Sequence, residues 1–352
     1  MARTVVVGLS GGVDSSTAAA LLLEQGYDVV GVTMRHLPAE TTNSCCSLEA
    51  LVDARRVAKK LNIPHYVVDV EQKFFERVIQ PFEDGYLAGI TPNPCAMCNR
   101  YIKFGAMWDW AAARGADFLA TGHYVRLHSQ DGVHYLGRGT DHAKDQSYLL
   151  YTMTQADLAH LLFPLGEYYK EDSRAIASRY GLATAHKAES QELCFVPKND
   201  YQGYLEEHRP EARKPGDIVD TKGHVVGQHQ GVAFYTVGQR RGLGITAAEP
   251  RYVVRLDAQA NQVVVGLKDE AAESVVHVRD VNYVLPIPPG DLSGEAKIRY
   301  NMEPQAARWI GQESHADLVF AEPQWAVSPG QIAVLYQNDV LVAGGKIDAK
   351  RK

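Results

Sequence analysis

The chain has 352 residues, of which 45% are hydrophobic and 22% charged, and its formal net charge at pH 7 is −6. A chain of this length and composition is long enough for two or three domains with substantial cores. The negative net charge excludes a surface that is basic throughout, so a nucleic-acid partner would have to be held by local basic patches and by shape.

The sequence predicts a cytoplasmic protein with no membrane partner. No apolar run approaches the roughly 20 residues that cross a bilayer, and the chain enters its first strand without a basic leader and cleavage site. Five cysteines, Cys45, Cys46, Cys95, Cys98 and Cys194, are odd in number and unevenly spaced. They do not look like a secreted disulfide framework, so chemistry or chance must account for them.

Residues 4–15, TVVVGLSGGVDS, form an apolar run that breaks into two glycines and then into hydroxyl and carboxylate side chains. We interpret this as a strand, an anion-binding loop and a helix that residues 15–17 cap and that stops at Gly26. Gly11 and Gly12 lack a Cβ, so their backbone N–H groups can turn onto an oxyanion at close approach. The helix that follows adds its positive end, which completes a phosphate site.

Polar side chains complete this loop. Ser10, Ser15 and Ser16 supply hydroxyls, and Asp14 either holds a backbone turn or helps to coordinate a magnesium ion that arrives with a nucleotide. The P-loop pattern and the G-x-G-x-x-G pattern between a strand and a helix are both absent. What remains, S-G-G-x-D-S, resembles the PP-loop of enzymes that split ATP between its α- and β-phosphates and activate a substrate as its adenylate.

Strands alternate with helices up to about residue 127. This pattern predicts a doubly wound parallel sheet with both faces covered, whose ligand site lies beyond the carboxyl ends of the strands. The Gly-rich loop, Met34 and Gly122 all fall at such ends. The predicted strands are 28–33, 65–70 and 117–121, and the predicted helices are 47–61, one from residue 71, and 101–114.

The later part of the chain changes character. A hairpin is expected within residues 128–139 and a helix at 170–180. From residue 215 onward, strand-like runs alternate with turn signals at 222–223 and around 257–261. The predicted fold is therefore an α/β domain, a small linking domain and a C-terminal all-β barrel. The predicted boundaries are 1–199, 200–268 and 269–352.

The remaining cysteines offer a second source of chemistry. Cys95 and Cys98 form a C-x-x-C pair in a proline-rich segment just before a helix, and Cys194 lies in the later motif ELCFVP. Thiolates near a helix N-terminus are stabilised as nucleophiles. A structural zinc site would need a fourth ligand, and a proline-flanked loop is an unusual setting for a thioredoxin-like pair. Beside a PP-loop, a nucleophile and a sulfur carrier that face each other become the leading interpretation.

A family resemblance covers nearly the whole chain: the sequence resembles the bacterial tRNA-specific 2-thiouridylases. The motifs that carry it are SGGVDSS at 10–16, NSCCS at 43–47, TPNP at 91–94, CN at 98–99, TGHY at 121–124, KDQSY at 144–148, FPLG at 163–166, LCF at 193–195 and YTVGQRRGLGI at 235–245. The PP-loop alone would equally fit amidotransferase-linked synthetases, argininosuccinate synthetase or lysidine synthetase. The later motifs exclude these.

The resemblance implies that ATP adenylates the 2-carbonyl oxygen of the wobble uridine in tRNAs for Lys, Glu and Gln, and that sulfur then replaces the activated oxygen. Cys194 would carry a persulfide delivered by a sulfur-relay protein or a cysteine desulfurase. Cys98 would attack this persulfide, release the sulfur and leave a Cys98–Cys194 disulfide.

The same resemblance assigns binding residues, with Mg²⁺ expected alongside ATP. The phosphates would be held by Gly8, Leu9, Ser10, Gly11, Gly12, Val13, Asp14 and Ser15, and adenosine by Met34 and Gly122. The target base would be lined by Asn93, Pro94 and Cys95. Contacts to tRNA would come from His123, Lys144, Asp145, Gln146, Arg299, Tyr300 and Gln331.

Cys95 departs from the family pattern, because many members have Asp after TPNP, where a carboxylate could act as general acid or base. In this chain a thiol would have to serve as that proton carrier. Alternatively, Cys95, Cys98 and Cys194 could be three ligands of a [4Fe-4S] cluster whose open iron binds sulfide. No metal site is certain from the sequence.

Two other classes of function stay open. One is an ATP-dependent ligase or amidotransferase that acts on a small molecule, for which pyrophosphate release would not depend on tRNA. The other is a nucleotide-binding RNA chaperone with an inactive centre. The presence of Cys98 and Cys194 beside an intact loop argues against the chaperone.

Overall fold

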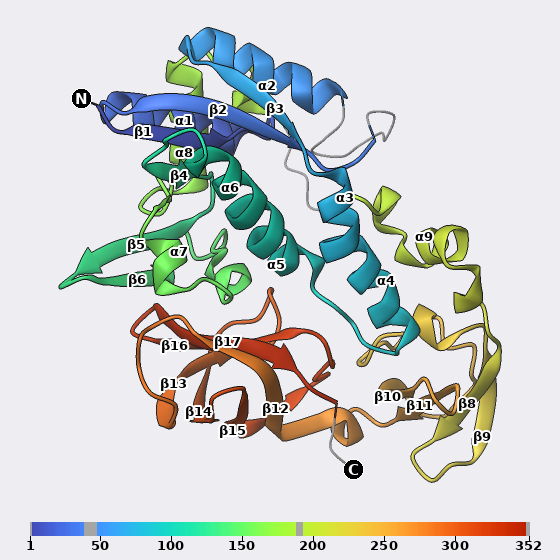
Figure 1. Ribbon diagram of the computed structural model, residues 1–352. Coiled ribbons are helices and arrows are strands. Elements are labelled where there is room, and N and C mark those ends of the chain that lie inside the picture. The colour runs from blue at the N-terminus through green and yellow to red at the C-terminus, as the bar shows by residue number, and fades with distance from the viewer. Residues whose placement is uncertain (1, 39–47, 188–192, 350–352) are drawn as a thin grey trace.

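The computed structural model of the chain describes residues 2–38, 48–187 and 193–349. Figure 1 shows an α/β domain in blue to green, a small sheet domain in yellow, and a barrel in orange to red. The predicted fold class is confirmed. Cys45, Cys46, the motif at 43–47 and the predicted start of a helix at residue 47 lie outside the described residues.

A parallel sheet forms the centre of the first domain, with strand order β3-β2-β1-β4-β7. Val5 and Val7 point to one face and Val6 to the other, and all three are buried. This alternation shows that both faces are covered, as the apolar runs predict. The strands are β1 (Thr4–Gly8), β2 (Asp28–Arg35), β3 (His65–Asp69), β4 (Phe118–Ala120) and β7 (Leu161–Leu162), the last of which the sequence did not predict.

Helices cover the two faces of this sheet. α1, α2 and α8 share the core with Val5 and Val7, while the helical segment that ends in α6 packs over Val6. A hydrogen bond of 2.9 Å from Thr17 Oγ1 to the Ser173 carbonyl ties α1 to α8. The α-helices of this domain are α1 (Val13–Glu24), α2 (Leu48–Leu61), α3 (Glu71–Phe74), α4 (Gln80–Leu87), α5 (Pro94–Cys98), α6 (Met107–Ala112), α7 (Gln155–Leu158) and α8 (Lys170–Arg179).

The first helix begins earlier than predicted. Gly12 is its N-cap residue and Val13 its first helical residue, so residues 15–17 lie inside the first turn instead of capping it. The Ser15 and Ser16 hydroxyls donate back to the Gly12 carbonyl, at 3.2 and 2.7 Å. The predicted stop is confirmed, because Gly26 follows the helix with a φ of 81°.

Two π-helical segments join consecutive α-helices into long rods. Phe75–Ile79 connects α3 to α4, and Pro81 lies in the first turn of α4. A proline inside a helix loses one backbone hydrogen bond and clashes with the preceding turn, and the wider π segment accommodates this.

The second rod runs from α5 through Asn99–Ala106 to α6, so it begins seven residues before the predicted helix at 101–114. The Asn93 side chain accepts a hydrogen bond of 3.1 Å from the Ala96 N–H, and Pro94 takes the first helical position, where no N–H is needed. The two cysteines of the C-x-x-C pair therefore lie in the first turns of the helix, not in the loop before it.

A small sheet with order β10-β11-β8-β9 forms the linking domain together with α9 (Tyr201–His208). The predicted turns are confirmed, since Gly223 and Asn261 have positive φ between paired strands. The strands are β8 (Gly216–Asp220), β9 (Val225–His229), β10 (Tyr252–Asp257) and β11 (Gln262–Gly266). Short 3-10 turns lie at Ser147–Leu150, Ala183–His186, Pro197–Asn199, Pro210–Ala212, Val232–Phe234 and Asp269–Ala271.

The C-terminal strands close into the predicted barrel, because β12 pairs with both β15 and β17. The predicted hairpin of the first domain, β5 (Val125–Gln130) with β6 (Val133–Arg138), joins this sheet where Val340 pairs with Gly137. The barrel and the first domain therefore share a sheet. The barrel strands are β12 (Ala272–Tyr283), β13 (Asp291–Lys297), β14 (Gln305–Gly311), β15 (His315–Trp325), β16 (Ile332–Gln337) and β17 (Val340–Ile347).

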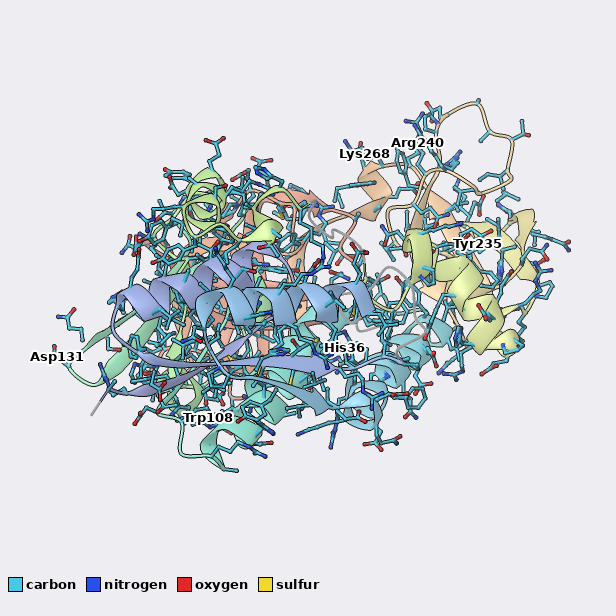
Figure 2. All side chains as sticks on the ribbon, turned by 90° about the horizontal axis from the view of Figure 1, so that it is seen from above. His36, Trp108, Asp131, Tyr235, Arg240 and Lys268 are labelled. Carbon is cyan, nitrogen blue, oxygen red and sulfur yellow. The ribbon has the colours of Figure 1, made fainter. Side chains whose placement is uncertain are left out.

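Figure 2, turned by a quarter from the first view, places Arg240 and Lys268 toward one end of the molecule and Asp131, at the tip of the β5–β6 hairpin, at the other.

Within the described ranges, no helix has the length and apolar character needed to cross a membrane.

A buried histidine predicts how the stability of the fold depends on pH. Burial, with Lys103 nearby, lowers the pKa of His123 well below its ordinary value. In the unfolded chain this group titrates near pH ~6.5, so below that pH the unfolded state binds a proton that the folded state does not. The free energy of unfolding therefore falls as pH decreases, by up to about 1.4 kcal/mol per pH unit from this group.

Urea unfolding at about pH 7 and about pH 5.5 should show a smaller acid loss of stability in His123→Gln than in the parent chain. The control is His128→Gln, which replaces an exposed histidine on β5. Equal pH dependence in the parent chain and His123→Gln would contradict this account.

Candidate functional site

The Gly-rich loop leaves the carboxyl end of β1 and is pressed against α2. Gly11 has a φ of 69°, and a Cβ built on it would lie 2.3 Å from the Ala50 carbonyl oxygen, so only glycine fits there. At Gly12 a Cβ would meet only Ser10 Oγ, at 3.4 Å, and no side chain of the described residues caps α1. The first N–H groups of α1 therefore have no side-chain cap among the described residues, which is a condition for an anion site at a helix N-terminus.

Serine hydroxyls fix the shape of this loop. Ser15 Oγ lies 3.2 Å from both Ser10 N and Ser10 Oγ, and it also donates to the Gly12 carbonyl. Ser15 is buried, whereas Ser10 is exposed. The Ser10 hydroxyl is thus the one of this pair that an incoming phosphate would meet first.

Asp14 is held by two groups that sequence reasoning did not select. Its carboxylate accepts hydrogen bonds from Lys170 Nζ at 2.7 and 2.9 Å and from the Tyr124 hydroxyl at 2.7 Å. Lys170 is only 8% exposed. These two side chains tie Asp14 to α8 and to the segment after β4, in addition to the predicted roles of holding a backbone turn or helping to coordinate magnesium, which stay predictions. Tyr124 follows His123 in the TGHY motif, which was a usable signal, but nothing in the sequence pointed to Lys170.

Met34 and Gly122 lie at the same carboxyl edge as the loop. A Cβ built on Gly122 would lie 2.7 Å from Ser15 N and from the Asp14 carbonyl carbon. The chain after β4 can therefore pass the first turn of α1 only because residue 122 is glycine. Met34, the penultimate residue of β2, is partly buried and packs against two of the hydrophobic clusters.

Two of the three described cysteines pack against the same hydrophobic cluster. Cys98 and Cys194 both pack against the cluster that contains Phe74, Phe82 and Phe195, and Met34 packs against the same cluster. Cys98 and Cys194 are half-buried, while Cys95 is exposed. The Asn93 side-chain oxygen caps α5, which leaves its amide NH₂ group to contact a ligand.

Two residues predicted to contact tRNA are buried. His123 is 6% exposed, and its Nδ1 lies 2.7 Å from Thr121 Oγ1, at hydrogen-bond distance. Its ring contacts the rings of Phe104 and Phe163. Asp145 is 4% exposed and accepts from Gly139 N, Ser147 N and Ser147 Oγ. Both side chains hold the local structure here. Their predicted contact with tRNA remains a prediction.

The other predicted tRNA-binding residues come partly from the first domain and partly from the barrel. Gln331 donates to the carbonyls of Thr91 and Pro92, at 3.0 and 3.4 Å, and thus joins the barrel to the TPNP segment. The Gln146 side chain accepts from Tyr124 N at 3.2 Å. Lys144 is partly buried.

Aromatic rings and cations line the same junction. Tyr300 is 37% exposed and makes an edge contact with the buried ring of Tyr148. Lys297 Nζ lies within 6 Å of both ring centroids, and burial lowers the pKa of this lysine. Arg299 donates to the Trp325 carbonyl at 2.9 Å. Lys297 is not among the predicted tRNA-binding residues.

Comparisons with known proteins identify the family of this chain. Three family models match the chain: "tRNA methyl transferase HUP domain" at residues 3–198, "tRNA methyl transferase PRC-barrel domain" at 202–267 and "Aminomethyltransferase beta-barrel domain" at 273–347. The tRNA-specific 2-thiouridylase of Moorella thermoacetica is 50% identical over 356 residues, which cover 98% of this chain and 99% of that protein. The chain belongs to the tRNA-specific 2-thiouridylase family.

A second thiouridylase of this family, from Carboxydothermus hydrogenoformans, is 48% identical, covering 99% of this chain and 98% of that protein. Among solved structures, the U34-tRNA thiolase NcsA from Methanococcus maripaludis with its [4Fe-4S] cluster matches with a TM-score of 0.37 and 18% identity, covering 59% of this chain and 67% of that one. A similarity at that level carries no inference about chemistry. The predicted family resemblance is confirmed by the full-length thiouridylases.

The close approach at Gly122 yields a stability test in this thiouridylase-family chain. Gly122→Ala should lower the free energy of unfolding by about 1–3 kcal/mol, because the added methyl group meets backbone atoms that cannot rotate away. Gly290→Ala is the matched control, since a Cβ there meets nothing within 4 Å. Denaturant unfolding of both variants checks this, and an unchanged stability of Gly122→Ala would contradict the tight packing of the loop.

Proposed function

We propose that the chain 2-thiolates the wobble uridine of tRNAs for Lys, Glu and Gln in an ATP-dependent reaction in the cytoplasm. The observation that carries this proposal is that Cys98, Cys194 and Met34 all pack against one hydrophobic cluster. Met34 also lies near the carboxyl end of β2, next to the end of β1 from which the Gly-rich loop leaves. We also propose the domain boundaries 1–199, 200–268 and 269–352 for this enzyme.

In the first step the 2-carbonyl oxygen of the uridine attacks the α-phosphorus of ATP and pyrophosphate leaves. The phosphates are held by residues 8–15, whose backbone N–H groups and helix end stabilise negative charge. Met34 and Gly122 contact the adenosine. Magnesium would arrive bound to the phosphates. Lys170 and Tyr124 already occupy the Asp14 carboxylate, so we assign Asp14 to holding the loop and no step to the metal.

The target base enters beside the first turn of α5. Bases that undergo chemistry must leave the stack, and the single-stranded anticodon loop makes this inexpensive. The Asn93 amide NH₂ donates to the base, and Pro94 and Cys95 line the pocket. The tRNA around the base is contacted or supported by Lys144, Asp145, Gln146, His123, Arg299, Tyr300 and Gln331.

In the second step Cys194 carries a persulfide. The Cys98 thiolate attacks Cys194 Sγ, a Cys98–Cys194 disulfide forms, and the terminal sulfur leaves as hydrosulfide. The hydrosulfide attacks C2 of the adenylated uridine, and AMP leaves with the original oxygen. A thiol reductant must then return the disulfide to two thiols, since each turnover oxidises the pair by two electrons. The persulfide is supplied by a sulfur-relay protein or a cysteine desulfurase.

An iron–sulfur cluster fits the described residues less well. Among residues 2–38, 48–187 and 193–349, no three His, Cys, Asp or Glu side chains gather closely enough to hold a metal ion. Cys95, Cys98 and Cys194 thus do not form a ligand set in this conformation, and the proposed reaction has no step through a cluster.

Cysteine variants test the sulfur chemistry. Cys98→Ala and Cys194→Ala should abolish thiolation of unmodified tRNA by ATP and a persulfide donor. Cys95→Ala should slow the reaction by about 10²-fold and still give product, because loss of a proton carrier costs about 10²–10⁴-fold whereas loss of the nucleophile stops sulfur transfer. Nucleoside mass spectrometry measures the thiolated uridine. Stoichiometric iron in anaerobically purified protein, lost together with activity in Cys95→Ala, would contradict the persulfide mechanism.

Loop variants test the adenylation step separately. Ser15→Ala and Asp14→Ala should remove tRNA-dependent pyrophosphate release, because the loop loses the groups that shape it, while a persulfide still forms on Cys194. Ser129→Ala, an exposed hydroxyl on β5, is the control. Adenylation of tRNA at the parent rate by both loop variants would remove the Gly-rich loop from the centre of the mechanism.

A further inference from the structure

A groove on the outer side of the first domain is not used by the proposed reaction. It lies between the end of β3 with α3 on one side and α6 on the other. Its carboxylates come from Asp69, Glu71, Glu76 and Asp109, and its cation is Lys73. Lys73 Nζ reaches across the groove to Asp109 Oδ2 at 3.5 Å.

The charge of this groove identifies what it can bind. Four carboxylates face one lysine, and the nearby Arg35 pairs with Asp69 and Glu71. The net negative charge repels the phosphates of tRNA. An oppositely charged protein surface is the complementary partner.

Apolar side chains beside the groove are exposed in a manner typical of docking surfaces. Tyr66 is 50% exposed and Phe75, on the segment that follows α3, is 45% exposed. The Tyr66 ring contacts the ring of Trp110, which lines the groove. Tyr66 belongs to β3, which is the terminal strand in the order of the parallel sheet. Exposed aromatic residues next to charged groups favour a protein partner.

Both elements that border the groove lead to the reactive cysteines. Phe74 on α3 makes an edge contact with Phe195, the residue after Cys194, at a centroid distance of 5.9 Å. The width of one helix, about 10 Å, thus separates the groove from the Cys194 segment. On the other side, Asp109 lies on the same helical rod as Cys98, farther along the chain.

We propose that this acidic groove docks the protein that donates sulfur, through a basic surface of that donor. This inference rests on the proposed function, because it supplies the persulfide of Cys194. A small donor domain has a radius of gyration of about 13 Å, which exceeds the roughly 10 Å width of the helix between the groove and the Cys194 segment.

The transfer balances without an oxidant. The Cys194 thiolate attacks the terminal sulfur of the donor's cysteine persulfide, a new S–S bond forms on Cys194, and the donor cysteine leaves as a thiolate. The sulfur oxidation level moves from donor to acceptor unchanged.

The test uses the full chain and a cysteine desulfurase charged with [³⁵S]cysteine as the donor. Glu76→Lys with Asp109→Lys reverses two exposed carboxylates of the groove. Labelling of Cys194 should slow by about tenfold or more, and the parent rate should fall with added salt. The matched control, Glu171→Lys with Glu313→Lys, makes the same charge change at exposed sites elsewhere and should label at the parent rate.

A parallel reaction with sodium sulfide, ATP and tRNA separates this inference from the proposed function. The groove variant should thiolate tRNA from sulfide at the parent rate, because no protein donor is involved. Three results would overturn the docking proposal: equal labelling of the groove variant and the parent chain, no labelling of the parent chain, or a groove variant that differs from the parent chain in oligomeric state. Failure of the parent chain to thiolate tRNA from both sulfide and the charged desulfurase would instead contradict the proposed function.

Discussion

The contact on which the site depends is the one between Asp14 and its two partners, Lys170 and Tyr124. It ties the first turn of α1 to the start of α8 and to the segment after β4, at distances of 2.7–2.9 Å. Because Lys170 is buried, this ion pair is poorly screened, and loss of one partner would leave a charge without compensation. The Gly-rich loop is thereby held in place before any ligand arrives, which is what preorganised electrostatic stabilisation requires.

Polar contacts also hold the barrel against the first domain. The Tyr148 hydroxyl donates to the Ile332 carbonyl at 2.7 Å, and the hydroxyls of Ser147 and Tyr336 lie 3.0 Å apart. Gln331 adds its bond to the Thr91 carbonyl. Ser147 and Tyr148 of the KDQSY motif therefore join the two domains. A binding surface made of both domains, such as a tRNA requires, keeps one geometry because this joint is internally satisfied.

The sequence predicted the elements whose pattern is local. Residues close together in the chain determine the alternation of Val5, Val6 and Val7. The same holds for the glycines with positive φ, Gly26 and Gly223. The π segments were not predictable, because their wider turns have no distinct periodicity. Nor was Lys170, whose role arises only when α8 packs on α1.

The same distinction, between features set by neighbouring residues and features set by tertiary packing, applies to the site residues. The glycines of the loop and Asn93 at the cap have roles that follow from residue type and neighbours. For His123 and Asp145 the family motif suggested contact with a ligand, but tertiary packing decides their burial. Whether a polar side chain faces solvent depends on what the rest of the chain brings over it.

The pairing of Val340 with Gly137 has a consequence for how such proteins can be recombined. Arg138 and Asp339 reinforce it through a backbone hydrogen bond of 2.9 Å and a side-chain ion pair of 3.1 Å. The α/β domain, the linking domain and the barrel follow one another in the chain, but they cannot be exchanged independently. A chimera that imports the barrel of a relative would need the β5–β6 hairpin and the KDQSY segment from that relative too, so crossover points that look natural in the sequence would cut through a shared sheet.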